Sequence, residues 1–246
     1  MESEIIDIER AAAEHWRGTE EEWLGSWLFR AAEGFTGRAN SALALGDPGV
    51  PIDDALDKMT AWYGARGVPP MIAVPMPETS ELDRQLARRS WPVRPGLALV
   101  MTADLPDVPT PPQDVELHVT GEPDAEWLRA YGQRGQAGLP RVQMKVLMSA
   151  PSQAFVGIRD GGKAVAVGRL SVSDGWAGIT AVAVNPEYRR RGLGTAITLG
   201  ICAEGTARGA EKVFLQAESG NDPAIALYER CGFTFSHRYH YRLAPS

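Results

Sequence analysis

The sequence predicts an α/β protein, and three observations support that prediction. Of its 246 residues, 44% are hydrophobic and 23% are charged, which is typical of a globular chain with a buried core. Short apolar runs of the kind found in strands alternate with longer segments whose apolar residues recur at helical spacing. The order strand, proline-containing loop, helix, strand, helix, aromatic residue and strand occurs once in each half of the chain.

The second half contains six expected strands and four expected helices. Tight turns at Asp160-Gly161-Gly162 and Ser173-Asp174-Gly175 separate three consecutive strands. The run 179–184 is apolar on both faces, which indicates a strand in the middle of a sheet. Strands are expected at 115–119, 155–159, 164–172, 176–184, 212–217 and 233–243, and helices at 123–134, at 139–149, from 193 onward and from 221 to 232.

The last two helices have the clearest signals. One apolar stripe follows the spacing i, i+3, i+4, i+7, i+8 from Leu193 to Ile201. Asn221 is a good N-cap, Pro223 suits the first turn, and Gly232 suits a helix end.

The first half of the chain repeats this order of elements with fewer strands and helices. Strands are expected at 26–31, 39–45, 71–74 and 97–101, and helices at 52–63 and 80–89. The interval from Leu45 to Trp91 is 46 residues, and that from Val184 to Phe233 is 49. The similar spacing predicts a tandem repeat of one fold.

Four prolines lie within residues 105–113, where they disfavour both helix and strand. We interpret this segment as a stiff linker between an N-terminal domain, residues 1–104, and a C-terminal domain, residues 114–246.

Charge and composition exclude several functional classes. The net charge is −6, with −8 in residues 1–113 and +2 in residues 114–246, and no basic stripe suggests nucleic-acid binding. No apolar run reaches the ~20 residues of a membrane span, and the acidic start is not a signal peptide. Two cysteines, Cys202 and Cys231, are too few for a disulfide framework, so a cytoplasmic location is expected.

Residues 182–195 carry the most informative motif. A buried strand ends before Pro186, and a glycine-rich turn then opens a helix. The first N–H groups of a helix have no internal partner, and Gly192 and Gly194 let an anion approach them closely. Arg189, Arg190 and Arg191 add positive charge, so this segment is a candidate binding site for a phosphate or pyrophosphate.

Other nucleotide-binding motifs do not fit. No Lys-Ser or Lys-Thr follows the glycines, as a P-loop requires, and Ile197 stands where a dinucleotide fingerprint needs its third glycine.

The chain resembles the GNAT family of acyl-CoA-dependent N-acetyltransferases. The family fingerprint Arg/Gln-x-x-Gly-x-Gly/Ala is matched by Arg189, Gly192 and Gly194. A second family signature is matched in order and spacing by Asn221, Ala224, Leu227-Tyr228 and Gly232-Phe233. The resemblance covers about residues 114–246 and implies an α+β mixed sheet that splays into a V, with helices on both faces.

The resemblance also implies a ligand and the residues that hold it. Acetyl-CoA is expected in the splay as cosubstrate, with no metal. Backbone groups of Val182 and Val184 would hold the pantetheine arm, and the pyrophosphate would lie on residues 190–195. The expected coenzyme-binding residues are Val182, Val184, Arg189, Arg190, Arg191, Gly192, Leu193, Gly194, Thr195 and Asn221.

Similar enzymes transfer the acetyl group directly, without an acyl-enzyme. For this transfer the amine must first lose a proton. The oxyanion that forms needs a hydrogen-bond donor, such as a backbone N–H near Val182. The departing thiolate needs an acid, for which Tyr228 is the candidate. Gln216 stands where some relatives have a Glu base. Glu218 is the nearest carboxylate, while His240, Glu187 and a water chain remain alternatives.

The loop from Gly46 to Asp54 occupies the matching place in the first half, but it lacks the arginine and glycine fingerprint and contains three aspartates. We therefore expect residues 1–104 to be a degenerate copy that lost the coenzyme, shapes the acceptor cleft and attracts cationic amines.

Two alternatives to an amine acetyltransferase remain open, namely a non-catalytic acyl-CoA sensor and an acetyltransferase of the mycothiol-synthase type. Expected acceptors are small-molecule or peptide amines, including polyamines, aminoglycosides and amino sugars. The expected state is a monomer or homodimer.

Overall fold

The computed structural model describes residues 4–112, 115–132 and 140–245. The chain divides into two compact units. Unit 1 contains Met1–Leu99, Arg141–Ser149 and His237–Ser246, and unit 2 contains Val100–Pro140 and Ala150–Ser236. These units group residues by contact, so the expected domain limits at residues 104 and 114 stay a prediction.

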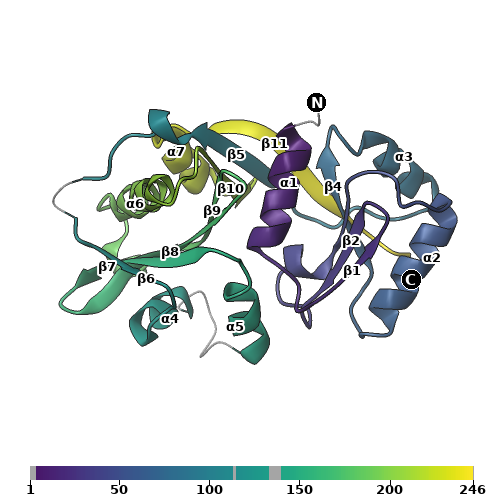
Figure 1. Ribbon diagram of the computed structural model, residues 1–246, viewed down its shortest axis with the longest axis horizontal. Helices are drawn as coiled ribbons and strands as arrows, with labels where there is room; N and C mark the ends of the chain where they lie inside the picture. The colour runs from purple at the N-terminus through teal and green to yellow at the C-terminus, as the bar shows by residue number, and fades with distance from the viewer. Residues whose placement is uncertain (1–3, 113–114, 133–139, 246) are drawn as a thin grey trace. The chain divides into compact units, whose positions relative to one another are not determined.

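Unit 1 has a five-stranded mixed sheet with the strand order β1-β2-β3-β4-β11 (Figure 1). β3 and β4 are parallel, and the other neighbouring pairs are antiparallel. Its strands are β1 (Glu20–Leu24), β2 (Trp27–Ala31), β3 (Ala42–Ala44), β4 (Met71–Met76) and most of β11 (Thr234–Leu243). Its helices are α1 (Glu4–His15), η1 (Arg38–Asn40), α2 (Ile52–Gly64), α3 (Ser80–Arg88) and α5 (Arg141–Leu147).

In unit 2 the strand order is β5-β10-β9-β8-β7-β6. β9 and β10 are parallel, whereas β6 to β9 form antiparallel pairs. The strands are β5 (Ala98–Asp104), β6 (Leu117–Thr120), β7 (Gln153–Asp160), β8 (Lys163–Ser173), β9 (Trp176–Val184) and β10 (Lys212–Glu218). The helices are η2 (Leu105–Asp107), α4 (Ala125–Gly132), η3 (Pro186–Tyr188), α6 (Leu193–Ala207) and α7 (Asp222–Arg230).

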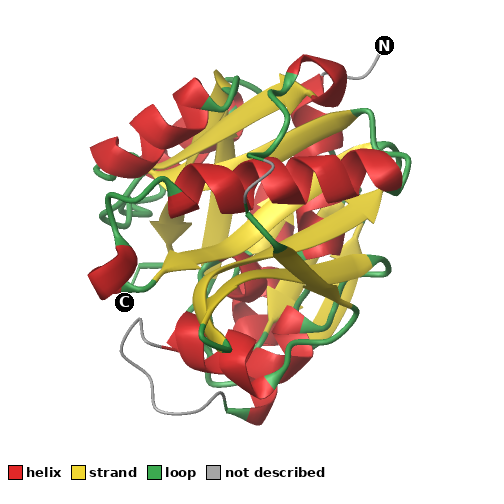
Figure 2. Ribbon diagram, turned by 90° about the vertical axis from the view of Figure 1, so that its left-hand side faces the viewer, coloured by secondary structure: helices red, strands yellow, loops and turns green. Residues whose placement is uncertain are grey.

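Helices lie against the strands, as the red and yellow ribbons of Figure 2 show. In unit 2, α6 and α4 cover opposite faces of the sheet. A Cβ added at Gly168 would meet Ile201 of α6 at 2.5 Å, whereas Trp127 of α4 packs edge-on against Phe155, at 5.0 Å between ring centroids. The expected α/β class and mixed sheet are therefore confirmed.

The two units repeat one topology. The succession β1-β2-β3-α2-β4-α3 in unit 1 has the strand directions of β7-β8-β9-α6-β10-α7 in unit 2. The strand beside β4 is β11, from the end of the chain, and the strand beside β10 is β5, from its first half. Each half of the sequence thus supplies a strand to the sheet built mainly by the other half.

Most expected elements are present, with three differences. The helix α1 and the strand β1 were not expected, and the expected strand 39–45 is shortened to β3 after η1. The helices expected at 123–134 and 139–149 correspond to α4 and α5, but residues 133–139 lie outside the described residues, as do residues 113–114 at the end of the expected linker. None of the described helices combines the length and apolar character of a transmembrane segment.

Candidate coenzyme and acetyl-transfer site

The parallel strands β9 and β10 pair over only part of their length. Their ladder joins Trp176–Ile179 to Lys212–Leu215. Both strands continue beyond it, β9 to Val184 and β10 to Glu218. Where two strands part, backbone groups that would otherwise bond to each other become available to a third segment. The end of β9 is therefore suited to hold an extended ligand.

A β-bulge lies at the same end of β9. Val167 of β8 is opposite Ala183, while Arg169 is opposite Thr180, so β9 has an extra residue here. Ala181 takes a left-handed φ of 56°, which is uncommon for a residue with a side chain. A bulge interrupts the ladder and turns backbone groups away from the neighbouring strand. The bulge therefore bends β9 directly next to Val182.

The turn after β9 is held by side chains. Asn185 Oδ1 accepts a hydrogen bond from Glu187 N at 3.2 Å, which caps η3. The Tyr188 hydroxyl donates to Asp160 Oδ2 at 2.8 Å, a bond that raises the pKa of Tyr188. The Arg191 guanidinium lies 4.9 Å from the centre of the Tyr188 ring. Arg189 and its two arginine neighbours are exposed, so their charge faces solvent at the start of α6.

The start of α6 depends on two glycines. Gly192 is the N-cap with a φ of 77°, and a Cβ at this position would enter open space. The first helical bond runs from Ala196 N to Gly192 O at 3.0 Å, so the N–H groups of Leu193, Gly194 and Thr195 have no partner within the helix. Together with the helix dipole they form a positive site for an anion.

Gly194 has a different role. A Cβ at this position would lie 2.5 Å from Leu227 Cδ1, so the absence of a side chain allows α6 and α7 to approach closely.

The strand end, the turn and the two helix starts enclose a cavity of about 220 Å³ in unit 2. It brings together six residues expected to bind or act on the coenzyme: Val182, Val184, Arg189, Gly194, Asn221 and Tyr228. It is also lined by Ala130, Ala183, Pro186, Ala224 and Leu227. The remaining expected residues, Arg190, Arg191, Gly192, Leu193 and Thr195, lie in the turn and first helical residues beside it.

The helix α7 presents Asn221 and Tyr228 to this cavity. Asn221 Oδ1 accepts from Ala224 N at 3.4 Å, which confirms the expected N-cap. The Tyr228 carbonyl accepts from Cys231 N at 3.0 Å and from Phe233 N at 3.1 Å. The backbone of Tyr228 is thereby fixed at the end of the helix, while its half-buried side chain borders the cavity.

Other groups considered from the sequence do not line this cavity. Glu218 and Glu187 are exposed, and neither lines the cavity. His240 belongs to unit 1, where its Nε2 lies 2.8 Å from Asp83 Oδ1.

The two cysteines are buried. Burial raises the pKa of Cys202 to about 12 and that of Cys231 to about 11. Both thiols are therefore protonated at neutral pH, which fits core residues better than nucleophiles.

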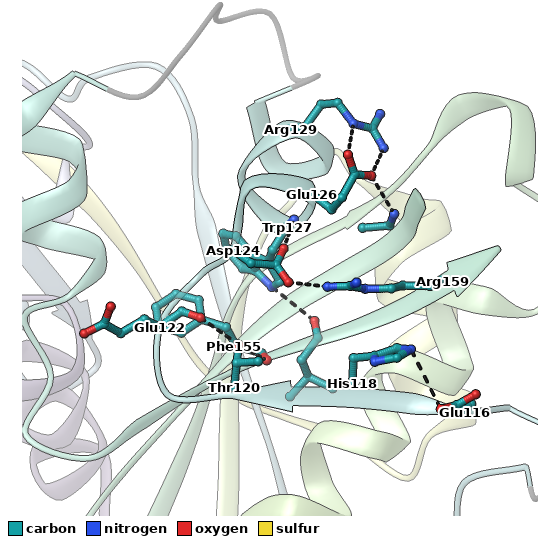
Figure 3. A network of polar contacts seen from close by, with 12 residues as sticks. Glu116, His118, Thr120, Glu122, Asp124, Glu126, Trp127, Arg129, Phe155 and Arg159 are labelled. Atoms are coloured by element: carbon teal, nitrogen blue, oxygen red, sulfur yellow. Dashed lines mark hydrogen bonds and ion pairs between the residues drawn. The ribbon is translucent and has the colours of Figure 1, made fainter. Parts of the chain in front are cut away.

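Nothing in the sequence indicates that Ala130 lies at the site. It reaches the cavity because polar contacts fix α4, as Figure 3 shows. Asp124 caps the helix by accepting from Trp127 N at 2.8 Å, and it also pairs with Arg159. Trp127 Nε1 donates to Val156 O at 3.1 Å, which ties the helix to the sheet. In the sequence, Asp124 is the residue that could have indicated where α4 begins, because aspartate is a common N-cap.

A mixed sheet that splays beside a bulged strand, with a glycine-opened helix on the same cavity, defines the GNAT class of acyltransferases. Residues 2–242 match the family described as "Probable histone acetyltransferase Rv0428c C-terminal", and the chain belongs to that family.

Two relatives match almost the whole chain. The uncharacterized N-acetyltransferase YobR of Bacillus subtilis is 27% identical over 249 residues, which is 98% of each chain. The probable histone acetyltransferase Rv0428c of Mycobacterium tuberculosis is 30% identical over 256 residues, covering 98% of this chain and 74% of that protein. Membership of the N-acetyltransferases is therefore established by sequence.

Solved structures confirm the fold. A GCN5-related N-acetyltransferase from Kribbella flavida superposes with a TM-score of 0.77 at 17% identity, covering 98% of this chain and 96% of that chain. A tandem GNAT protein from the clavulanic acid biosynthesis pathway superposes with a TM-score of 0.63 at 16% identity, covering 84% and 76%. The expected tandem GNAT-like fold is confirmed.

Proposed function

We propose that this N-acetyltransferase moves the acetyl group of acetyl-CoA to a primary amine by direct attack in a ternary complex. The amine nitrogen attacks the thioester carbonyl carbon, a C–N bond forms and the C–S bond breaks. The nitrogen loses one proton and the departing sulfur gains one. The observation that carries the proposal is one cavity lined jointly by Val182, Arg189 and Tyr228.

The donor groups of this cavity suit coenzyme A. The coenzyme would supply an activated thioester. Its pyrophosphate is anionic, and the start of α6 offers backbone N–H groups that have no partner within the helix, together with the exposed charges of Arg189, Arg190 and Arg191. Gly192 leaves open space in front of these groups. The strand end at Val182 and Val184 would hold the pantetheine arm by its amides.

We assign the acid that protonates the departing thiolate to Tyr228. It lines the cavity, and its phenolic hydroxyl can donate a proton. No cysteine suits an acyl-enzyme, because Cys202 and Cys231 are buried with raised pKa values. Direct attack needs only a positioned acid and base.

We assign the base to Glu218, acting through water. Its side chain is exposed at the end of β10, and its carbonyl accepts from Asn221 N at 2.9 Å, next to the start of α7. An exposed carboxylate has the solvent access that a water relay requires.

The reaction is tested by following thiol release from acetyl-CoA with separate panels of peptide N-termini, polyamines, aminoglycosides and amino sugars. We expect one panel to raise thiol release above the hydrolysis rate, with acetylated amine found by mass spectrometry. A sensor would bind acetyl-CoA in calorimetry without amine-dependent thiol release, and that result would exclude an enzyme for these acceptors.

A further inference from the structure

A hairpin contacts the turn that leads from β9 into α6. We call residues 185–192 the coenzyme turn, because Arg189 within it lines the coenzyme cavity. The hairpin of β7 and β8 reverses direction at residues 161–162, directly after Asp160. The Tyr188 hydroxyl donates to Asp160 Oδ2 at 2.8 Å, although the two residues are 28 positions apart in the chain. The end of this hairpin therefore lies against the coenzyme turn.

The backbone of the coenzyme turn needs support from outside. Arg190 has a left-handed φ of 64°, which residues with a side chain rarely adopt. Such a conformation persists only where surrounding contacts hold it. The backbone bonds that shape η3 end with Arg189 N, which donates to Pro186 O at 3.3 Å, one residue before Arg190. The contacts that hold Arg190 in place must therefore come from side chains on either side of it.

Tyr188 provides two such contacts. Its hydroxyl bonds to Asp160, and the Arg191 guanidinium lies 4.9 Å from the centre of its ring. A guanidinium near an aromatic face is attracted by the ring. The bond to Asp160 raises the pKa of Tyr188, so the hydroxyl remains a donor at neutral pH. The row Asp160, Tyr188 and Arg191 thus fixes residues on both sides of Arg190.

The end of the hairpin is itself anchored to α4. Arg159, which precedes Asp160, pairs with Asp124 at the start of that helix, as Figure 3 shows. On the other strand of the hairpin, Ala164 N donates to Glu126 Oε2 at 3.2 Å. Because the hairpin has these anchors of its own, the bond from Tyr188 to Asp160 acts mainly on the coenzyme turn.

We propose that Asp160 and Tyr188 are positioning residues for acetyl-CoA, which hold the coenzyme turn in its binding geometry before the ligand arrives. The assignment rests on the proposed function, because that function places the coenzyme diphosphate at the start of α6. Neither residue lines the cavity, so both act through Arg191 and the backbone of the turn. A turn that is already ordered in the free protein raises affinity, because less entropy is lost on binding.

The test measures the Kd for acetyl-CoA by calorimetry in the full chain. Asp160→Ala removes a negative charge together with the acceptor of the Tyr188 hydroxyl. Loss of a negative charge near the site favours an anion, whereas loss of the bond weakens binding. We expect the Kd to rise about three- to tenfold, as for one lost hydrogen bond. The direction of the change therefore separates positioning from general electrostatics.

The matched control is Asp160→Asn, which lacks the charge but keeps an amide oxygen that can accept from Tyr188. Its Kd should stay within about twofold of the wild-type value. Tyr188→Phe removes the hydroxyl and keeps the ring beside Arg191, so it should raise the Kd as much as Asp160→Ala does. Because the two residues act through one bond, the double variant should show no further rise. Thiol release at saturating acetyl-CoA should be unchanged in each variant, since the reacting groups are untouched.

The outcomes separate this assignment from the proposed function. A wild-type chain that does not bind acetyl-CoA overturns both. Wild-type binding with an unchanged or lower Kd in Asp160→Ala overturns the positioning role alone. The same holds if Asp160→Asn weakens binding as much as Asp160→Ala, or if the effects of Asp160→Ala and Tyr188→Phe add in the double variant. Should Asp160→Ala fail to fold, Tyr188→Phe decides the question, and an unchanged Kd then overturns the positioning role.

Discussion

The guanidinium Nη1 of Arg169 donates a hydrogen bond to Thr180 Oγ1 at 3.2 Å, directly before the bulge of β9. Arg169 is fully buried, and its Nη2 donates to Gln153 Oε1 at 2.9 Å. It lies on the face of the sheet opposite α6, because the adjacent Gly168 faces Ile201. The contact holds Thr180 in place one residue before the left-handed Ala181.

Replacing Thr180 with Val keeps the shape of the side chain but removes the acceptor for a buried charge. We expect a loss of about 1 to 3 kcal/mol in the free energy of unfolding, measured by urea denaturation. The control Thr180→Ser keeps the hydroxyl and loses only a methyl group, which costs about 0.8 kcal/mol. Equal destabilisation by Val and Ser would show that the bond contributes nothing.

Gly194→Ala should disturb the coenzyme cavity, since the new Cβ would lie 2.5 Å from Leu227 Cδ1. We expect a cost of about 1 to 3 kcal/mol in stability and a several-fold rise in KM for acetyl-CoA. Gly64→Ala is the control, because a Cβ there meets nothing within 4 Å and alanine favours the helix. A KM unchanged in Gly194→Ala would mean that Leu227 moves without affecting the coenzyme.

Tyr228→Phe removes the proposed acid and keeps the ring that borders the cavity. We expect kcat to fall about 10- to 1000-fold, with little change in the Kd for acetyl-CoA. Tyr188→Phe is the comparison, because it also removes a tyrosine hydroxyl, but one that bonds to Asp160 and holds the turn before α6 without lining the cavity. Wild-type turnover in Tyr228→Phe would remove Tyr228 from the mechanism.

Gly192→Glu should abolish acetyl-CoA binding, measured by calorimetry. The carboxylate would stand in the open space before α6 and repel the pyrophosphate, and the φ of 77° adds strain. Gly209→Glu is matched to it, since Gly209 also has a positive φ, 82°, and open space, but lies at the other end of α6. Loss of binding in both variants would indicate strain and not charge.

Asp83→Asn should destabilise the protein at neutral pH but not in acid. Burial by itself raises the pKa of Asp83, but hydrogen bonds and charge from Arg242 and His240 outweigh it, and the pKa is lowered. A lowered folded-state pKa contributes stability above the unfolded value, near 3.8, that is lost as pH falls through the folded value.

We therefore expect urea denaturation at pH 7 to show a loss of about 1 to 2 kcal/mol in Asp83→Asn, and the difference from wild type to shrink below pH 4. Asp57→Asn, on the exposed side of α2, should change little at either pH. A difference for Asp83→Asn that stays constant with pH would contradict the assigned pKa.

Local signals predicted the C-terminal elements well. The limits of β9 were expected correctly, because Asp174 and Gly175 form a turn with positive φ before it and Pro186 follows it. Asn221 and Gly232 likewise marked the limits of α7. Such residues act through their own backbone conformation, which is why the sequence alone reveals them.

Features that depend on tertiary contacts were missed. The acidic strand β1 has low β propensity and forms because it pairs with β2. The left-handed Ala181 carries no sequence signal, since alanine rarely adopts that conformation. Because Arg169 is a charged residue in a strand, the sequence suggests that it faces solvent. In the structure it is buried, and its guanidinium donates to Gln153 and Thr180. The partners of Arg169 lie 16 and 11 residues away in the chain, beyond the reach of local sequence patterns.

The exchange of β5 and β11 has a practical consequence for anyone who divides the gene. A fragment that ends at the proline-rich segment would carry β4 without its antiparallel neighbour, whose residues Arg238–Leu243 pair with Met71–Met76. A fragment that starts there would carry β10 without β5 beside it. We therefore expect each fragment alone to be less stable than the full chain, and the two to regain stability when they are produced together and complement each other.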